Sequence, residues 1–85
     1  MFWMYILKSI SDGDLYIGST GNLPRRISEH NAGKVSSTKA RAPFKLVYCE
    51  GYLSEEEARH REHNLKLRAR ALRQLILRIK KSMAL

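Results

Sequence analysis

Five side chains in this 85-residue sequence are of types that could together hydrolyse a phosphate ester. Tyr5 and Tyr16 carry hydroxyl groups that can position a water molecule or, if a pKa falls from about 10, accept its proton. The guanidinium of Arg26 matches phosphate oxygens with its fork of donors and stays charged. His30 could hydrogen-bond the phosphate or a tyrosine. Glu62 could hold a hard cation such as Mg²⁺ that keeps most of its water.

Two points of this assignment stay open. The residue types do not decide which tyrosine would be the general base. His60 and His63 flank Glu62 and could be mistaken for a zinc cluster, but the 100° step of a helix directs both away from the Glu62 stripe. We therefore expect no histidine-rich zinc site.

The tyrosines fall in two predicted strands, at residues 2–9 and 15–20. The turn between them contains Asp12-Gly13, a pair that favours a tight hairpin. With an even number of loop residues, Tyr5 faces the same side of the hairpin as Tyr16 and Gly18. Gly18 is then best explained as a place where another group approaches the backbone closely.

A helix predicted between Asn22 and Gly33 positions the arginine and the histidine. Asn22 is a suitable N-cap and Gly33 a suitable C-cap. Arg26 and His30 fall within the apolar stripe that faces the sheet, whereas Arg25 points to solvent. Charged or polar groups on such a stripe are costly unless they bind something.

The second half of the chain predicts a polar loop, a strand and two helices. The loop covers residues 34–43. The strand runs from Phe44 to about Tyr52, and its side chains are expected to alternate strictly between the two faces of the sheet. Ser54 and Glu57 form a capping box, so a helix begins there and places Glu62 on one stripe with buried residues. We expect this stripe to bring Glu62 to the same surface of the sheet as the two tyrosines, the arginine and the histidine. Residues 69–83 form a last, amphipathic helix. The order β-β-α-β-α-α predicts an α+β fold, a three-stranded, mostly antiparallel sheet flanked by helices, as a single domain over residues 1–85.

The net charge of +8 comes entirely from the last third of the chain. Residues 58–85 carry nine Lys and Arg side chains and one acidic residue, Glu62, whereas the two signs balance in residues 1–57. Such a block is typical of proteins that bind a polyanion, nucleic acid before anionic membrane. The basic residues that we expect to contact nucleic acid are Arg25, Lys39, Arg41, Arg70, Arg73 and Arg78.

The motifs in this order resemble the GIY-YIG nuclease superfamily. Tyr5 and Tyr16-Ile17-Gly18 resemble its paired tyrosine motif, and residues 22–31 its arginine helix. Residues 62–66 resemble its later glutamate motif. The likeness covers nearly the whole chain and is closest to small stand-alone members related to the N-terminal nuclease domain of excinuclease C. It implies a DNA endonuclease that uses one Mg²⁺ or Mn²⁺ held by Glu62 and leaves a 3′-hydroxyl and a 5′-phosphate.

Two departures from that pattern support an alternative. Trp3-Met4-Tyr5 stands where the family name has Gly-Ile-Tyr. No asparagine follows Asn64, although many members carry one after the glutamate, and Gln74 occupies the corresponding offset. A nucleic-acid-binding module with a weak or inactive site is therefore the first alternative, and an adaptor that docks its basic helix on a protein or a membrane is the second.

Composition sets the remaining expectations. No apolar run reaches the roughly 18 residues of a membrane span, and the N-terminus lacks the features of a signal peptide. The single cysteine, Cys49, has apolar neighbours, which indicates a buried thiol in a reducing cytoplasm. DNA is the expected partner and RNA stays an alternative; we expect no membrane partner and no small-molecule cofactor, and the sequence does not predict the oligomeric state.

Overall fold

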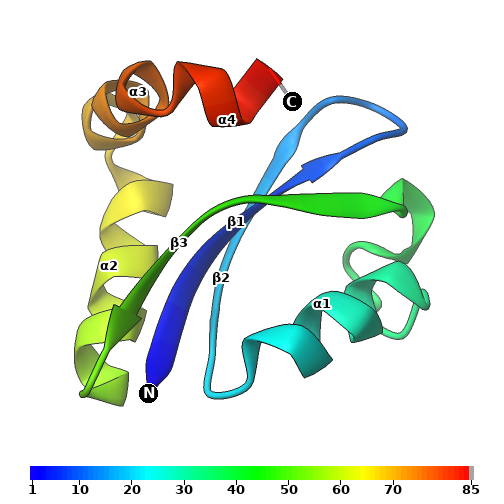
Figure 1. Ribbon diagram of the computed structural model, residues 1–85, viewed down its shortest axis with the longest axis horizontal. Coiled ribbons are helices and arrows are strands. Elements are labelled where there is room, and N and C mark those ends of the chain that lie inside the picture. Colours follow the sequence, from blue (N-terminus) through cyan, green and yellow to red (C-terminus); the bar gives the residue numbers. More distant parts are fainter. Residues whose placement is uncertain (85) are drawn as a thin grey trace.

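The computed structural model describes residues 1–84 and builds them on an antiparallel three-stranded sheet (Figure 1). The central strand β1 (Phe2–Ser9) pairs with β2 (Leu15–Thr20) on one side and with β3 (Phe44–Tyr52) on the other. The helices are α1 (Leu23–Asn31), α2 (Glu55–Leu67), α3 (Ala69–Arg78) and α4 (Lys80–Ala84), with one 3₁₀ turn at Lys39–Arg41. This confirms the predicted α+β class and element order.

The helices cover opposite faces of the sheet. Because side chains alternate along a strand, β1 sends Met4 and Ile6 to one face and Tyr5 and Leu7 to the other. α2 and α3 pack against the Met4 face, where Leu65 and Leu75 complete the core; α1 packs against the Tyr5 face (Figure 1). Each face therefore has its own apolar cluster.

The hairpin register places the two tyrosines as the sequence predicts. Tyr5 pairs with Gly18 and Leu7 with Tyr16, so Tyr5, Gly18 and Tyr16 share the α1 face. Ser19 pairs with Met4 and therefore points to the α2 face.

The strict alternation expected in the third strand is wrong. The register between β1 and β3 shifts at Ile6 and Leu7, because Leu7 pairs with Leu46 while Ile6 pairs with Tyr48. Val47 is the extra residue of this β-bulge. Val47 and Tyr48 both join the α2-face cluster, and Cys49 packs beside Tyr5 and is half-buried rather than fully buried.

The predicted N-caps of α1 and α2 are confirmed, whereas the C-cap of α1 is Ala32 and the predicted Gly33 follows it. The Asn22 side chain accepts from the Arg25 N–H, and Gly33 ends the turn after α1 with φ +73°. The Ser54 side chain accepts from the Glu57 N–H at the start of α2.

The single helix expected over residues 69–83 is broken. α3 ends at Arg78, and the backbone of Ile79 leaves the helical region at φ −113° and ψ 31°. The bend lets Ile79 and Met83 both pack against the cluster that contains Leu75. No helix among residues 1–84 is both long and apolar enough to cross a bilayer.

Candidate active site

A buried chain of hydrogen bonds links the first strand to α1 and to the loop after it. The Tyr5 hydroxyl lies 3.0 Å from Nε2 of His30, and Nδ1 of His30 lies 2.9 Å from the Thr38 hydroxyl. All three side chains are at most 1% exposed. Thr38 lies 3.5 Å from the Val35 carbonyl, to which only a hydroxyl proton can be donated. We therefore place the ring proton of neutral His30 on Nδ1, which donates it to the Thr38 hydroxyl. Nε2 of His30 then accepts the hydrogen bond that the Tyr5 hydroxyl donates.

Gly18 allows the Tyr5 side chain to cross the neighbouring strand. A Cβ atom at position 18 would lie 2.5 Å from the Tyr5 hydroxyl oxygen, closer than packed atoms tolerate. Because β2 is an edge strand, the phenol reaches from the central strand toward the edge of the sheet. This agrees with the close approach that the sequence predicts at Gly18.

Tyr16 lies beside this chain but is less buried. Its ring centroid is 4.8 Å from that of His30 and 6.3 Å from that of Tyr5. Within residues 1–84, no side-chain hydrogen bond engages its hydroxyl, and its ring is half-exposed on the edge strand. Tyr16 is therefore accessible to a substrate that lies along this edge.

Arg26 is half-exposed at the mouth of the same cluster. Its Nη1 lies 3.2 Å from Oε1 of Glu29, one turn along α1, and its interaction with the Tyr5 hydroxyl raises the pKa of the guanidinium. Arg25 is exposed, as predicted. Arg26 thus combines a stable positive charge with access to solvent.

Burial controls the electrostatics of the two hydrogen-bonded groups. Burial raises the pKa of Tyr5 to about 12, and the negative charge of Glu62 adds to this effect while Arg26 opposes it. Burial, and then the charge of Arg26, lowers the pKa of His30 below its ordinary value. Both side chains are therefore neutral near pH 7.

Glu62 approaches from the other face of the sheet. α2 packs on the Met4 face, and the Glu62 carboxylate accepts a 2.6 Å hydrogen bond from the hydroxyl of Ser19 on β2. Lys66, one turn further along α2, places Nζ 2.6 Å from Oε2 of Glu62 and 5.9 Å from the centre of the Tyr16 ring. The expectation that all five residues stand on one face is thus wrong for Glu62, which lies on the α2 face and reaches the β2 edge, where it contacts Ser19 and Lys66.

Three residues of this arrangement were missed by the sequence analysis as parts of a site. Thr38 lies in a loop whose polar composition gives no sign that one member is buried. Ser19 is an ordinary strand residue whose role depends on the docking of α2. Only Lys66 had a readable signal, its i, i+4 spacing from Glu62, which is typical of a helical ion pair.

The donors present suit a hydrated hard cation. Within residues 1–84 no group of three or more His, Cys, Asp or Glu side chains could enclose a metal ion. Glu62 offers a single half-buried carboxylate at the open edge, 21% exposed. Mg²⁺ is commonly held by one or two carboxylates with water and phosphate oxygens. His60 and His63 are exposed on α2, and His60 hydrogen-bonds Asn64.

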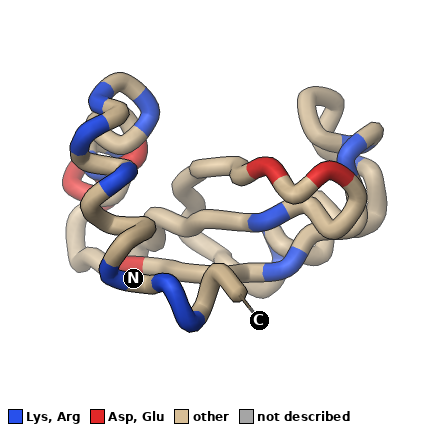
Figure 2. Tube along the Cα trace, turned by 90° about the horizontal axis from the view of Figure 1, so that it is seen from above, with Lys and Arg blue, Asp and Glu red and all other residues tan. Residues whose placement is uncertain are grey.

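The expected nucleic-acid contacts fall into two groups. Arg41 is engaged within the protein, because it pairs with Asp12 at 3.0 Å and lies over the Phe44 ring. Lys39 is exposed near α1. The second group lies on α3, on the far side of the sheet from α1, and consists of the exposed residues Arg70, Arg73 and Arg78. Figure 2 shows Lys and Arg positions gathered along α3 and α4.

Comparison with known proteins identifies the family. Residues 1–75 match the family model described as the GIY-YIG catalytic domain. The chain belongs to the GIY-YIG family. A UPF0213 protein from Streptococcus pneumoniae is 45% identical over 69 residues, 80% of this chain and 69% of that protein. A UPF0213 protein from Natronomonas pharaonis is 38% identical over 76 residues, 88% of each chain.

The fold of the GIY-YIG chain is also similar to that of a solved relative. The solution NMR structure of a UPF0213 protein from Bacillus halodurans has a TM-score of 0.57 and 35% sequence identity, and the match covers 93% of this chain and 87% of that one. The resemblance inferred from the tyrosine, arginine and glutamate motifs is thereby confirmed.

The departures from the GIY-YIG pattern have structural explanations in part. Met4 is fully buried in the α2-face cluster and Trp3 packs on the α1 face, so both fill strand positions. Gln74 is exposed on α3, and no side-chain hydrogen bond among the described residues joins it to the site.

Proposed function

We propose that the protein is a metal-dependent endonuclease that hydrolyses phosphodiester bonds in DNA, with residues 1–85 acting as one nuclease domain. The observation that carries this proposal is the approach of Glu62 to Tyr16 at the β2 edge: Ser19 on β2 donates to Glu62, and Lys66, the ion-pair partner of Glu62, lies 5.9 Å from the centre of the Tyr16 ring. Tyr5, Tyr16, Arg26 and His30 come from one side of the sheet, and the Glu62 carboxylate arrives from the other. Membership of the GIY-YIG family supports the same class of reaction.

Arg26 would bind the scissile phosphate. Its guanidinium is accessible, stays charged and offers paired donors to two phosphate oxygens. As negative charge builds on those oxygens in the transition state, a fixed positive group beside them lowers the barrier.

The two tyrosines would have different roles. Tyr5 keeps its proton, because its pKa is about 12 and its hydroxyl donates to His30. Tyr5 therefore does not act as the base. Its hydroxyl, whose orientation is fixed by the bond to His30, would position the attacking water or the phosphate. Tyr16 is half-exposed on the edge strand, so we assign to it the role of general base: in its ionised, phenolate form it would accept the proton of the attacking water and become a neutral phenol.

Glu62 would hold a single Mg²⁺ or Mn²⁺, together with water and phosphate oxygens. When bound, such an ion supplies charge neutralisation at the phosphate and lowers the pKa of a coordinated water molecule. Ser19 keeps one oxygen of Glu62 oriented at the edge. The products would carry a 3′-hydroxyl and a 5′-phosphate.

A binding module with an inactive site is the second candidate, and one observation favours it. Within residues 1–84, Gln74 is exposed and makes no side-chain hydrogen bond to the site, so no contact supports it as a substitute for the asparagine of other members. The adaptor alternative has less support, since Leu75, Ile79 and Met83 pack into the core and only part of the apolar surface of this region, such as Leu67 and Leu77, stays exposed.

A cleavage assay with matched variants tests the proposal. Labelled duplex, flap, branched and single-stranded DNA, together with one RNA, are incubated with Mn²⁺ and either the protein or its Glu62→Gln variant. We expect cleavage of at least one DNA, a loss of at least about 100-fold in the variant, and unchanged DNA retention. Gln keeps an acceptor for Ser19, so the fold is preserved. Retention without cleavage by the unaltered protein would favour the inactive module.

A further inference from the structure

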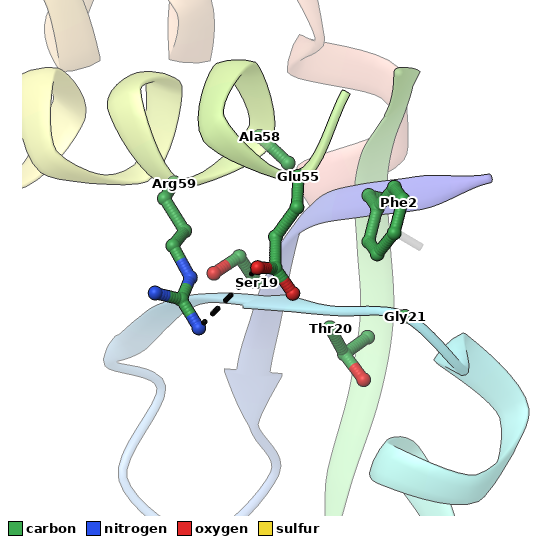
Figure 3. Close-up of a pocket in the computed structure, with 7 residues that line it drawn as sticks. All are labelled: Phe2, Ser19, Thr20, Gly21, Glu55, Ala58 and Arg59. Atoms are coloured by element: carbon green, nitrogen blue, oxygen red, sulfur yellow. Dashed lines mark ion pairs between the residues drawn. The ribbon is translucent and has the colours of Figure 1, made fainter. Parts of the chain in front are cut away.

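A cavity of about 200 Å³ lies between the end of β2 and the first turns of α2 (Figure 3). Phe2 forms one wall, Ser19 of β2 and Gly21 just after the strand form the floor, and Glu55 and Arg59 reach into the cavity from α2. The volume is below the 300 Å³ or so of pockets that enclose a drug-sized ligand. It suits a flat group of about the size of one nucleobase.

This cavity lies directly beside the part of the β2 edge where Glu62 contacts Ser19. The Ser19 hydroxyl that lines it is the one that donates to Oε1 of Glu62. Arg59 precedes Glu62 by three positions, so both side chains leave the same side of α2. A strand whose phosphate lies beside Glu62 would therefore continue past Ser19 into the cavity.

The lining groups have the chemistry of a nucleotide site. Arg59 is exposed, and among residues 1–84 an ion pair with Glu55 at 3.8 Å is the one polar contact of its guanidinium, which Figure 3 draws as a dashed line. Such exposed pairs are weak, so the guanidinium can turn to a phosphate at little cost. The half-buried Phe2 ring presents an aromatic surface on which a base can stack.

We propose that this cavity binds one nucleotide of the substrate strand, next to the phosphate that is cleaved. Arg59 contacts the phosphate of that nucleotide, and Phe2 contacts its base. Glu55 holds Arg59 in the absence of substrate. The inference rests on the proposed function, because it places the cavity along the path of a strand bound at Glu62.

The test measures binding and needs no cleavage. The ¹⁵N-labelled full chain is titrated with deoxycytidine 5′-monophosphate, with inorganic phosphate and with deoxycytidine, and amide shifts are followed by NMR. We expect the nucleotide to shift the Gly21 and Ala58 amides saturably and to bind more tightly than phosphate or nucleoside. Since the phosphate of the nucleotide could also bind at Arg26, Arg26→Gln serves as a second background in which the Gly21 and Ala58 shifts persist.

Matched variants assign the contacts. Arg59→Gln should weaken binding about tenfold, since a charge-assisted hydrogen bond is lost, whereas Glu55→Gln should strengthen it by releasing Arg59. Gly21→Ala should weaken binding, because its Cβ would enter the cavity 3.6 Å from the Phe2 ring without strain. Arg68→Gln removes an exposed charge at the other end of α2 and should leave these shifts unchanged.

Two outcomes would overturn the inference. If inorganic phosphate matches the nucleotide and Phe2→Leu has no effect, the cavity takes an anion and no base. If shifts occur only around Tyr16 and His30, the cavity is not used at all. Either result would reject the nucleotide site but would say nothing against nuclease activity, which the cleavage assay tests separately. Nucleotide binding in the cavity without any DNA cleavage would reject the nuclease activity but not the nucleotide site.

Discussion

The hydroxyl of Ser19 on β2 and Oε1 of Glu62 on α2 are 2.6 Å apart, and this hydrogen bond ties α2 to the edge strand on the face of the sheet opposite α1. α1 delivers Arg26 and His30 to one face of the sheet, whereas α2 packs on the other. An edge strand is the place where both can meet, because no further strand separates the faces there. Ser19 fixes the carboxylate at this edge, and Gly18 lets the Tyr5 phenol extend toward the same place.

Thr38 should stabilise the protein through the orientation of His30. Thr38→Val keeps most of the side-chain volume and leaves the Nδ1–H of His30 buried without a partner. We expect a loss of about 1–3 kcal/mol in the free energy of unfolding, which corresponds to about 4–8 °C in Tm per kcal/mol for a domain of this size. Denaturant unfolding followed by circular dichroism measures it. Thr38→Ser retains the hydroxyl and should stay within about 1 kcal/mol; equal losses in both variants would show that packing, not the hydrogen bond, matters.

The lowered pKa of His30 predicts a pH-dependent stability. In the unfolded chain His30 protonates near pH 6.5, whereas in the folded protein burial and Arg26 keep it neutral to lower pH. The unfolded state then binds more protons, so the free energy of unfolding is highest above pH 6.5 and falls as the pH decreases through the lowered pKa.

Thermal unfolding at several pH values between 4.5 and 7.5 tests this expectation. The part of this window above about pH 5.5 reports on His30, because below it carboxylates such as Glu50, whose folded-state pKa is lowered by Arg61 and two tyrosines against the effect of burial, also begin to take up protons in the unfolded chain. His60 and His63 are exposed, so the His60→Gln/His63→Gln variant should keep the full dependence. A flat profile in the unaltered protein, or loss of the slope in that control, would contradict the assignment to His30.

Local patterns in the sequence predicted those features that depend on neighbouring residues. The hairpin register, the Asn22 and Ser54 caps and the stripe that holds Arg26 and His30 follow from turn chemistry and periodicity. The bulge at Val47 and the break at Ile79 could not be predicted, because packing against the central cluster determines both. The Thr38 and Ser19 contacts depend on how distant elements dock, and the approach of Glu62 from the second face has the same origin.

Arg26 and Arg25 offer a matched pair for DNA binding. Arg26 stands beside Tyr5, whereas Arg25 is exposed next to it. Arg26→Gln should weaken DNA retention and reduce the salt dependence by the equivalent of about one phosphate contact, and Arg25→Gln should do less. Fluorescence anisotropy at 50–200 mM salt gives both quantities.

The exposed arginines of α3 should contribute through long-range attraction. Charge reversal at Arg70, Arg73 and Arg78 together should weaken DNA binding without preference for sequence, because the excess positive charge lies there. Binding that is independent of salt, or that these reversals leave unchanged, would reject a role of the basic helix.

Lys66 should compete with a metal ion for Glu62. Its ammonium lies 2.6 Å from Oε2 of the carboxylate, the oxygen that Ser19 leaves free, so a cation must displace it. We therefore expect weak Mn²⁺ binding in the absence of DNA and a Tm that EDTA barely changes. Lys66→Met removes the competitor and should raise the Mn²⁺ affinity by about fivefold, the scale of one partly exposed ion pair.

Paramagnetic broadening of the Ser19 and Glu62 amides by Mn²⁺ measures this affinity. Lys66→Arg keeps the charge beside Glu62 and should retain the weak binding, and Glu62→Gln should abolish the broadening with or without Lys66. The stability cost of Lys66→Met should be small, about 0.5 kcal/mol for an i, i+4 pair on a helix surface. An equal gain in Glu62→Gln/Lys66→Met would mean that the ion binds elsewhere. No gain in Lys66→Met would mean that the ammonium does not guard the carboxylate, and that the weak binding has its cause in the single protein ligand alone.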